Sequence, residues 1–358
     1  MKNLIRPNGS RAARLAAAGI VVAAAIAAAA GLAGRGYASP TGKAYKASYP
    51  HKERFERPTL RHGHLIIRGT RAGDTIALRL KAGDPGTVQV DVGDNGSADF
   101  SFALARVERI DVKGRAGDDL LRIDDSNGVF TDAIQTTLDG GSGNDRLAGG
   151  KGSEILLGGS GNDSIDGNGG NDLSFMGSGD DTFIWDPGDG SDTVEGQAGA
   201  DTMRFNGAGA AEKVDLTANG NRLRFTRDVA SITMDTHGVE RVDFNALGGA
   251  DVVTVNDLSG TDVSAVNVDL AGALGGASGD NAADRVVVNG TNGVDAIDVS
   301  GDAGEVKTSG LVPTVAIFHS EAANDRLEVN TLAGNDTVNS AGLAAGAIQL
   351  FVDGTLVP

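Results

Sequence analysis

Apolar and polar residues alternate in short runs along most of the chain, and turns rich in Gly, Asn and Asp separate the runs. Such alternation is typical of β-strands that bury one face. It predicts strands at residues 109–112, 121–123, 252–255 and 286–288. The sequence lacks helical periodicity outside residues 15–32. We therefore expect an all-β protein.

A nine-residue repeat occurs seven times between residues 140 and 204. The copies are GGSGNDRLA (140–148), GGKGSEILL (149–157), GGSGNDSID (158–166), GNGGNDLSF (167–175), MGSGDDTFI (176–184), PGDGSDTVE (187–195) and GQAGADTMR (196–204). Position four is Gly in every copy, and position eight is apolar in all but one. Position six is always acidic: Asp145, Glu154, Asp163, Asp172, Asp181, Asp192 and Asp201.

This spacing predicts a flattened coil of 18 residues. Gly permits positive φ, so six residues can form a tight turn, and the next three form a short strand. Copies n and n+2 then stack about 4.8 Å apart, with Asp145 over Asp163 and Asp163 over Asp181. Carboxylates at that distance repel by about 3–4 kcal/mol at an effective dielectric constant near 20. A divalent cation between the turns reverses this repulsion, and an oxygen shell completed by glycine-turn carbonyls suits Ca²⁺ better than Mg²⁺.

The nine-residue repeat resembles the G-G-x-G-x-D-x-U-x nonapeptide of the RTX (repeats-in-toxin, hemolysin-type) calcium-binding family. The resemblance implies a parallel β-roll, a type of β-solenoid, that holds Ca²⁺ between turns n and n+2. Its ligands would be the Asp carboxylates and the backbone carbonyls of the Gly-rich turns. Carried over to this sequence, these are Asp145, Asp163, Asp172, Asp181, Asp192 and Asp201, with Glu154 in the equivalent position, and Gly143, Gly161, Gly170 and Gly179.

Several residues depart from the repeat. Glu154 is one methylene longer than Asp, so we expect a poorer site at 154/172 than at 145/163 and 163/181. Ser174 occupies an expected core position. Trp185 and Asp186 are inserted between two copies, and we expect them to interrupt the stacking. The segment 91–99 resembles part of an EF-hand loop, but Phe102 stands where a bidentate Glu is needed, so we interpret it as a polar turn.

A longer, degenerate repeat covers the rest of the chain. RIDVKGRAGDD (109–119), RVDFNALGGAD (241–251) and RLEVNTLAGND (326–336) align without gaps, and related strands follow at 133–140, 265–272 and 347–354. We expect degenerate β-solenoid segments at 73–139 and 205–358, flanking the RTX-like β-roll at 140–204. Four acidic residues in these segments either bind further Ca²⁺ or accept hydrogen bonds from their own turn, and we favour the second interpretation: Asp119, Asp251, Asp295 and Asp336.

Charge is distributed unevenly along the chain. Residues 1–72 carry 13 basic and 2 acidic side chains, whereas the remainder carries 18 basic and 46 acidic ones, for a formal net charge of −17 overall. An acidic body attracts cations and repels nucleic acid and anionic membranes. The chain has no Cys, which excludes a disulfide scaffold, a thiolate zinc site and a Cys nucleophile.

The N-terminus predicts export from the cell. Lys2, Arg6, Arg11 and Arg14 precede the uncharged run 15–32, and residues 36–38 offer a small-x-small cleavage site. These features indicate a signal peptide at residues 1–38, with a retained membrane anchor as the alternative. Residues 39–72 are predicted to be a basic, disordered linker in which His62 and His64 form at most a weak metal site.

Motifs for catalysis are missing from the sequence. It contains no G-x-S-x-G elbow, no H-E-x-x-H helix and no P-loop, so we expect no enzymatic activity. The sequence favours a secreted calcium-binding protein with a structural or adhesive role, outside the cell or at its surface, without stable membrane insertion after signal cleavage. Two alternatives remain: a calcium-dependent module that binds a glycan or a protein, and a secreted calcium-dependent hydrolase or cytolysin.

Overall fold

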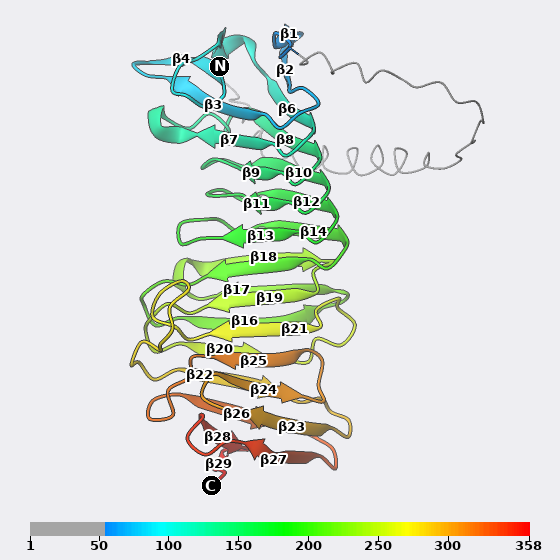
Figure 1. The fold of residues 1–358 in the computed structure, drawn as a ribbon, viewed down its shortest axis with the longest axis vertical. Coiled ribbons are helices and arrows are strands. Elements are labelled where there is room, and N and C mark those ends of the chain that lie inside the picture. Colours follow the sequence, from blue (N-terminus) through cyan, green and yellow to red (C-terminus); the bar gives the residue numbers. More distant parts are fainter. Residues whose placement is uncertain (1–53) are drawn as a thin grey trace, which may run out of the picture. The chain divides into compact units, whose positions relative to one another are not determined.

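Two long β-sheets face each other in residues 54–358, the part of the chain that the computed structural model describes (Figure 1). The predicted signal peptide, and the predicted linker as far as residue 53, lie outside these residues. The helical segments of the described part are short 3₁₀ turns: η2 (Leu104–Arg106), η3 (Asp125–Asn127) and η4 (Val229–Ser231). Within residues 54–358, no helix has the length and apolar character needed to cross a membrane.

The first sheet contains 15 strands of the described residues. Their spatial order is β1 (Thr59–Arg61), β2 (His64–Arg68), β6 (Arg109–Ala116), β8 (Gln135–Ser142), β10 (Glu154–Ser160), β12 (Leu173–Ser178), β14 (Thr193–Ala198), β18 (Ile232–His237), β17 (Arg222–Arg227), β16 (Lys213–Asn219), β20 (Val252–Val255), β22 (Arg285–Asn289), β26 (Arg326–Asn330), β28 (Gln349–Val352) and β29 (Thr355–Leu356).

The second sheet contains 14 strands from the same part of the chain. Their spatial order is β27 (Thr337–Leu343), β23 (Ala296–Gly301), β24 (Glu305–Ser309), β25 (Thr314–Phe318), β21 (Ala265–Asp269), β19 (Arg241–Asn245), β15 (Thr202–Asn206), β13 (Thr182–Trp185), β11 (Ser164–Asp166), β9 (Arg146–Ala148), β7 (Leu120–Asp124), β3 (Thr75–Lys81), β4 (Asp84–Val92) and β5 (Phe100–Ala103).

From β6 to β15 the chain alternates strictly between the two sheets, so that each pair of strands makes one coil of a parallel β-roll. Leu138 pairs with Leu156 and Leu156 with Ser174, a step of 18 residues per coil. Leu147, Ile165 and Phe183 align in the same way in the second sheet. The expected all-β, parallel β-roll fold and its 18-residue coil are confirmed.

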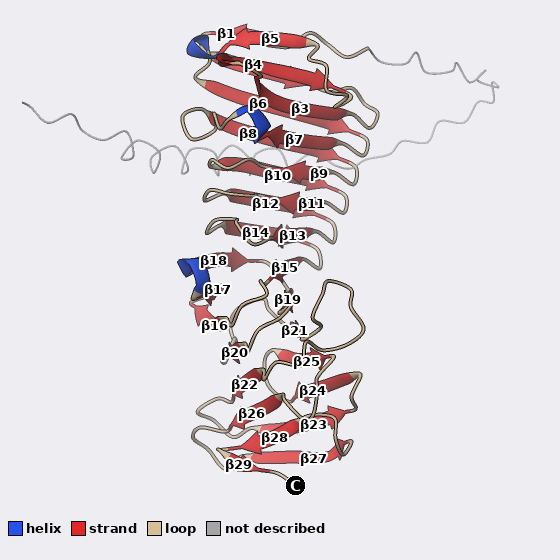
Figure 2. Ribbon diagram, turned by 90° about the vertical axis from the view of Figure 1, so that its left-hand side faces the viewer, coloured by secondary structure: helices blue, strands red, loops and turns tan. Residues whose placement is uncertain are grey.

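Outside the nine-residue repeats, antiparallel strands interrupt the parallel stacking. The strands β16, β17 and β18 form an antiparallel meander within the first sheet, and β23, β24 and β25 form another within the second. Both meanders join parallel strands above and below, so each sheet continues without a break (Figure 2). The flanking segments are therefore a mixed solenoid, rather than the wholly parallel one that the sequence predicted.

The core is a thin layer of side chains between the two sheets. The position-eight residues of the repeats are fully buried there, including the polar exception, Ser174. The largest buried side chains lie around the last repeats and just beyond them: Trp185 stacks on Phe205 with ring centroids 3.9 Å apart, and Phe205 in turn contacts Phe225. Thin cores of this kind depend on neighbouring coils to cover each layer.

The predicted linker is wrong where the structure describes it. Strands β1 and β2 lie within residues 54–72, and Leu65 and Ile67 of β2 are fully buried. Strand β2 pairs in parallel with β6, so it forms the first-sheet part of an additional coil before residue 73. The sequence did not reveal this strand because it is short and surrounded by basic residues. Only two apolar side chains form its buried face.

The insertion of Trp185 and Asp186 does not interrupt the stacking, contrary to expectation. Coil spacing rises from 18 to 20 residues, because Leu173 pairs with Thr193 and Thr182 pairs with Thr202. The indole of Trp185 is completely buried, and its N–H donates to the carbonyl of Gly190 (2.8 Å). The extra length is accommodated by a longer strand and a wider corner.

We predict that Trp185→Ala lowers the free energy of unfolding by about 3–5 kcal/mol, since it leaves a cavity beside Phe205 in a core too thin to rearrange. Urea denaturation followed by far-UV circular dichroism measures the change. The control is Leu332→Ala, because Leu332 is 59% exposed and should change stability by less than about 0.5 kcal/mol. Equal effects of the two substitutions would contradict this description of the core.

Candidate metal centre

The acidic residues of the repeats lie at the corners where the chain passes between sheets, and form two columns. The first column lies at corners leading from the first sheet to the second, and contains Asp145, Asp163, Asp181 and Asp201. The second column lies at the opposite corners. In the repeat region it contains Glu154, Asp172 and Asp192. The predicted stacking of copies n and n+2 is therefore present at both edges.

Hydrogen bonds connect the members of each column from coil to coil. The backbone N–H of Asp145 donates to Oδ1 of Asp163 (2.7 Å), and that of Asp163 donates to Oδ1 of Asp181 (2.7 Å). The column continues from Asp181 to Asp201 (2.9 Å). In the second column the N–H of Glu154 donates to Asp172 (2.7 Å), and the N–H of Asp172 donates to Asp192 (2.8 Å). One oxygen of each accepting carboxylate is thus hydrogen-bonded to the backbone of the neighbouring coil.

The other oxygen of these carboxylates has no hydrogen-bond partner, although it is buried. The side chains are at most 3% exposed. An ionised oxygen in this state costs several kcal/mol unless a cation neutralises it. The unpartnered atom is Oδ2 in Asp119, Asp145, Asp163, Asp172, Asp181, Asp192 and Asp201.

The first glycine of a repeat packs closely against the acidic side chain and against a main-chain carbonyl of the next coil. A Cβ atom on Gly158 would overlap both Oδ2 of Asp163 and the carbonyl oxygen of Met176 in the next coil. A Cβ atom on Gly149 would meet the carbonyl oxygen of Gly167 and Oε2 of Glu154, although this Oε2 already accepts a hydrogen bond. A carboxylate oxygen and a main-chain carbonyl oxygen therefore converge beside these glycines.

The glycines at position four of the repeats, which were the predicted carbonyl ligands, do not lie in the same surroundings as the first glycines. Gly143, Gly161, Gly170 and Gly179 all have φ between +105° and +129°. A Cβ atom on Gly161 would overlap the carbonyl oxygen of Gly143, and one on Gly179 would overlap that of Gly161. These residues form the tight turn and pack coil against coil, and their role as ligands stays a prediction.

This donor set fits a hard cation. Within residues 54–358, no three His, Asp or Glu side chains are grouped so as to hold one metal ion, so main-chain carbonyls or water would complete a ligand shell. Oxygen ligands from carboxylates and main-chain carbonyls, in a flexible arrangement, are those that Ca²⁺ accepts.

Comparison with known protein families agrees with this chemistry. The family model for the RTX calcium-binding nonapeptide repeat matches in four copies, at residues 137–153, 148–183 and 188–207. The chain carries RTX calcium-binding repeats. A comparison with curated proteins found no match. The RTX match covers about a fifth of the chain and coincides with the regular coils from β8 to β15.

Glu154 differs from the other RTX acidic residues in the way its longer side chain folds. Its Oε2 accepts the N–H of Gly150 in the same corner (2.7 Å), and its Oε1 has no partner. The extra methylene lets the carboxylate turn back toward its own turn. The poorer site expected at 154/172 stays a prediction.

The sequence was partly wrong about the acidic residues outside the RTX repeats. Asp295 does bond within its own turn, to the N–H (2.7 Å) and hydroxyl (2.9 Å) of Thr291. Asp119 and Asp251 instead accept N–H groups from the neighbouring coil, and Asp336 accepts the N–H of Asp295 (2.8 Å). Asp119 and Asp251 therefore resemble the RTX residues, each with a buried, unpartnered Oδ2, whereas Asp336 is only half-buried. The spacing Gly-x-x-x-x-Asp, seen at 114–119 and at 158–163, is a sequence signal for such corners.

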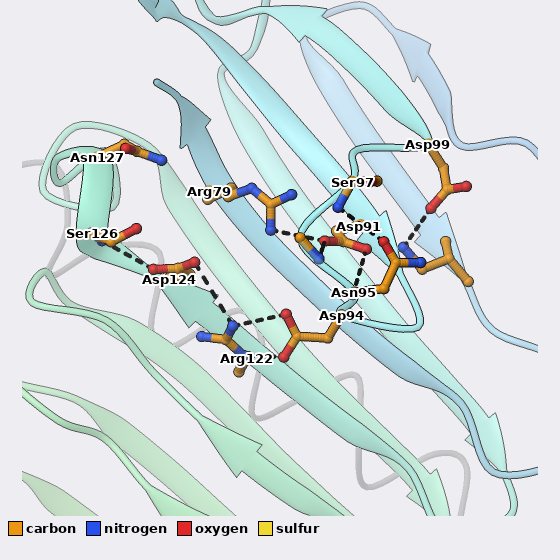
Figure 3. Close-up of polar contacts among 12 residues, drawn as sticks. Arg79, Asp91, Asp94, Asn95, Ser97, Asp99, Arg122, Asp124, Ser126 and Asn127 are labelled. Carbon is orange, nitrogen blue, oxygen red and sulfur yellow. Dashed lines mark hydrogen bonds and ion pairs between the residues drawn. The ribbon is translucent and has the colours of Figure 1, made fainter. Parts of the chain in front are cut away.

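The segment 91–99 is a polar turn, as predicted. Asp91 accepts N–H groups from Asn95 (3.2 Å) and Gly96 (2.9 Å) and pairs with Arg79 (2.8 Å). Figure 3 shows Asp91 facing Arg79. Asp94 is bound by Arg122. Both carboxylates therefore already have partners supplied by the chain.

Burial raises the pKa of the RTX carboxyls. Desolvation is the largest cause, and neighbouring carboxylates raise the pKa further, whereas the N–H bond from the next coil lowers it. The pKa of Asp163, Asp192 and Asp201 is raised to about 7, and that of Asp172 to about 9. Without a cation, the folded protein therefore retains protons that the unfolded chain releases near pH 4.

We predict that the cation-free protein loses stability as the pH rises from about 4 to about 8. In that range the unfolded state binds fewer protons than the folded state, so the free energy of unfolding falls with pH. Urea denaturation of chelator-stripped protein at pH 5, 6, 7 and 8 measures the trend. Repeating the series in Ca²⁺ is the control, since a bound cation should remove the fall. A cation-free stability that is flat or rises over this range would contradict the assignment.

Proposed function

We propose that this is a secreted protein whose RTX roll folds on binding Ca²⁺ outside the cell, and that it acts there as a structural or adhesive component without enzymatic activity. The observation that carries the proposal is the pair of columns of buried carboxylates, each with an unpartnered oxygen. Calcium binding follows from the RTX repeats themselves. Secretion and the structural role are the proposed part.

Charge repulsion explains why folding would depend on Ca²⁺. The charges that act most strongly on Asp163 are the carboxylates of Asp181 and Asp145, above and below it. Each stacked pair repels by about 3–4 kcal/mol at an effective dielectric constant near 20. A cation bound only in the folded state contributes its binding free energy to folding. Extracellular calcium modules bind in the range of about 10⁻⁴–10⁻³ M, so such a chain would stay unfolded inside the cell and fold outside it.

The arrangement around His319 supports a non-catalytic role. Its Nδ1 lies 2.7 Å from Oδ1 of Asp269, which is the type of contact found in hydrolase triads. However, the neighbouring Ser320 is buried, and its hydroxyl donates to the carbonyl of Ala347 (3.0 Å). The hydroxyl is thus engaged with the backbone and is not offered to the imidazole as a nucleophile.

We predict that Ca²⁺, and not Mg²⁺, converts the chelated chain from coil to β-structure. A titration followed by far-UV circular dichroism, with calorimetry to record the heat, measures this. A chain already folded in chelator, with no heat on adding Ca²⁺, would refute the folding switch. The search for function would then move to residues 205–358.

A second prediction concerns single carboxylates. Asp181→Asn keeps an oxygen that accepts the N–H of Asp163 but removes the charge, so the Ca²⁺ midpoint should rise by about 10-fold or more. The matched control is Asp180→Asn, because it removes the same charge one residue away, from an exposed side chain, and its midpoint should change far less. Equal midpoints for the two variants would show that Asp181 does not contribute a charge to the site.

A further inference from the structure

The second column resumes beyond the RTX repeats, with four acidic residues at the corners before β16, β20, β22 and β26. The N–H of Glu212 donates to Asp251 (2.7 Å), that of Asp251 to Asp284 (2.8 Å), and that of Asp284 to Asp325 (3.1 Å). All four side chains are at most 3% exposed. The coils here are irregular, with 33 to 41 residues between successive members, and they lie outside the RTX match.

The two ends of this column obtain partners from the chain itself. Arg227, which is 4% exposed, forms a buried ion pair with Oε1 of Glu212. At the other end, Oδ2 of Asp325 accepts the N–H of Glu321 in the same corner (2.7 Å). Glu212 thus has a counter-charge, although its Oε2 is unpartnered, and both oxygens of Asp325 accept main-chain hydrogen bonds.

Asp251, in the middle of the column, has no such partner. Its side chain is 1% exposed and its Oδ2 lacks any hydrogen bond. The charges acting on it come from Asp284, Glu212 and Asp280, all carboxylates. Asp280 is held beside the same corner, where its Oδ2 accepts the N–H of Gly249 (2.8 Å). Among residues 54–358, no ion pair reaches Asp251 or Asp284.

We propose that Asp251, with Asp284 in the adjoining coil, binds a hard divalent cation of the Ca²⁺ class at a site separate from the RTX repeats. A buried carboxylate oxygen that faces other carboxylates needs a positive charge. The contrast with Glu212 supports this, because there a guanidinium supplies the charge. Oxygen donors alone, without His or Cys, favour Ca²⁺ over transition metals.

The test counts the Ca²⁺ ions bound per full-length chain by equilibrium dialysis against ⁴⁵Ca²⁺ at pH 7.5. Asp251→Asn keeps the acceptor for the N–H of Glu212 and removes the charge, so it should bind one ion fewer than the wild type. Asp295→Asn is the matched control, because both of its oxygens are bonded within their own turn, and it should bind the wild-type number. An unchanged count for Asp251→Asn overturns the proposal and indicates that Asp251 is kept protonated.

A second measurement does not depend on any variant folding. Wild-type crystals soaked in Tb³⁺ should show an anomalous peak beside Oδ2 of Asp251, and the absence of a peak there overturns the proposal. The outcome is separable from that of the RTX sites, whose peaks would lie between the coils of residues 140–204. Peaks there and none at Asp251 would refute this site alone, whereas a peak at Asp251 alone would refute the RTX folding switch.

Discussion

The structure depends on one contact that recurs at the corners, a backbone N–H that donates to the carboxylate of the next coil. The contact from Asp145 to Asp163 is an example. It sets the register of the coils, because it joins equivalent positions 18 residues apart. It also buries an acidic side chain with one oxygen hydrogen-bonded and the other without a partner. The register and the demand for cations therefore have the same origin, and neither can be changed without the other.

The chain meets this demand for positive charge in more than one way. In the RTX coils, acidic residues stack on acidic residues, and free carboxylate oxygens lie close to main-chain carbonyl oxygens beside glycines. At Glu212 the chain supplies Arg227 instead, whose guanidinium also lies 5.2 Å from the ring of Trp185. At Asp295 the hydroxyl and N–H of Thr291 satisfy both oxygens. The same corner thus becomes an ion site, an internal ion pair or an ordinary turn, depending on a few neighbouring residues.

The sequence predicted the repeat region well because its signal is periodic. The position-eight residues, such as Leu156 and Ile165, identified the core, and the position-six acids identified the stacked columns. It did not predict the meanders at β16–β18 and β23–β25, since an alternating apolar pattern is the same in parallel and antiparallel strands. The sequence also carried no sign that carboxylates such as Asp251 accept hydrogen bonds from the neighbouring coil. The coils there differ in length, so the bonded residues recur at no fixed spacing.

The meander at β16–β18 also interrupts one of the two columns of hydrogen-bonded acidic residues. The first column runs from Asp74 through the RTX acids to Glu240, each joined to the next by a hydrogen bond. The second column stops after Asp192 and resumes at Glu212, because the meander is inserted between β14 and β20. In a solenoid each coil is stabilised chiefly by its neighbours. The RTX corners of the first column are therefore joined in one unbroken series of hydrogen bonds. Asp251 instead lies in the resumed part of the second column, which begins at the ion pair of Glu212 with Arg227.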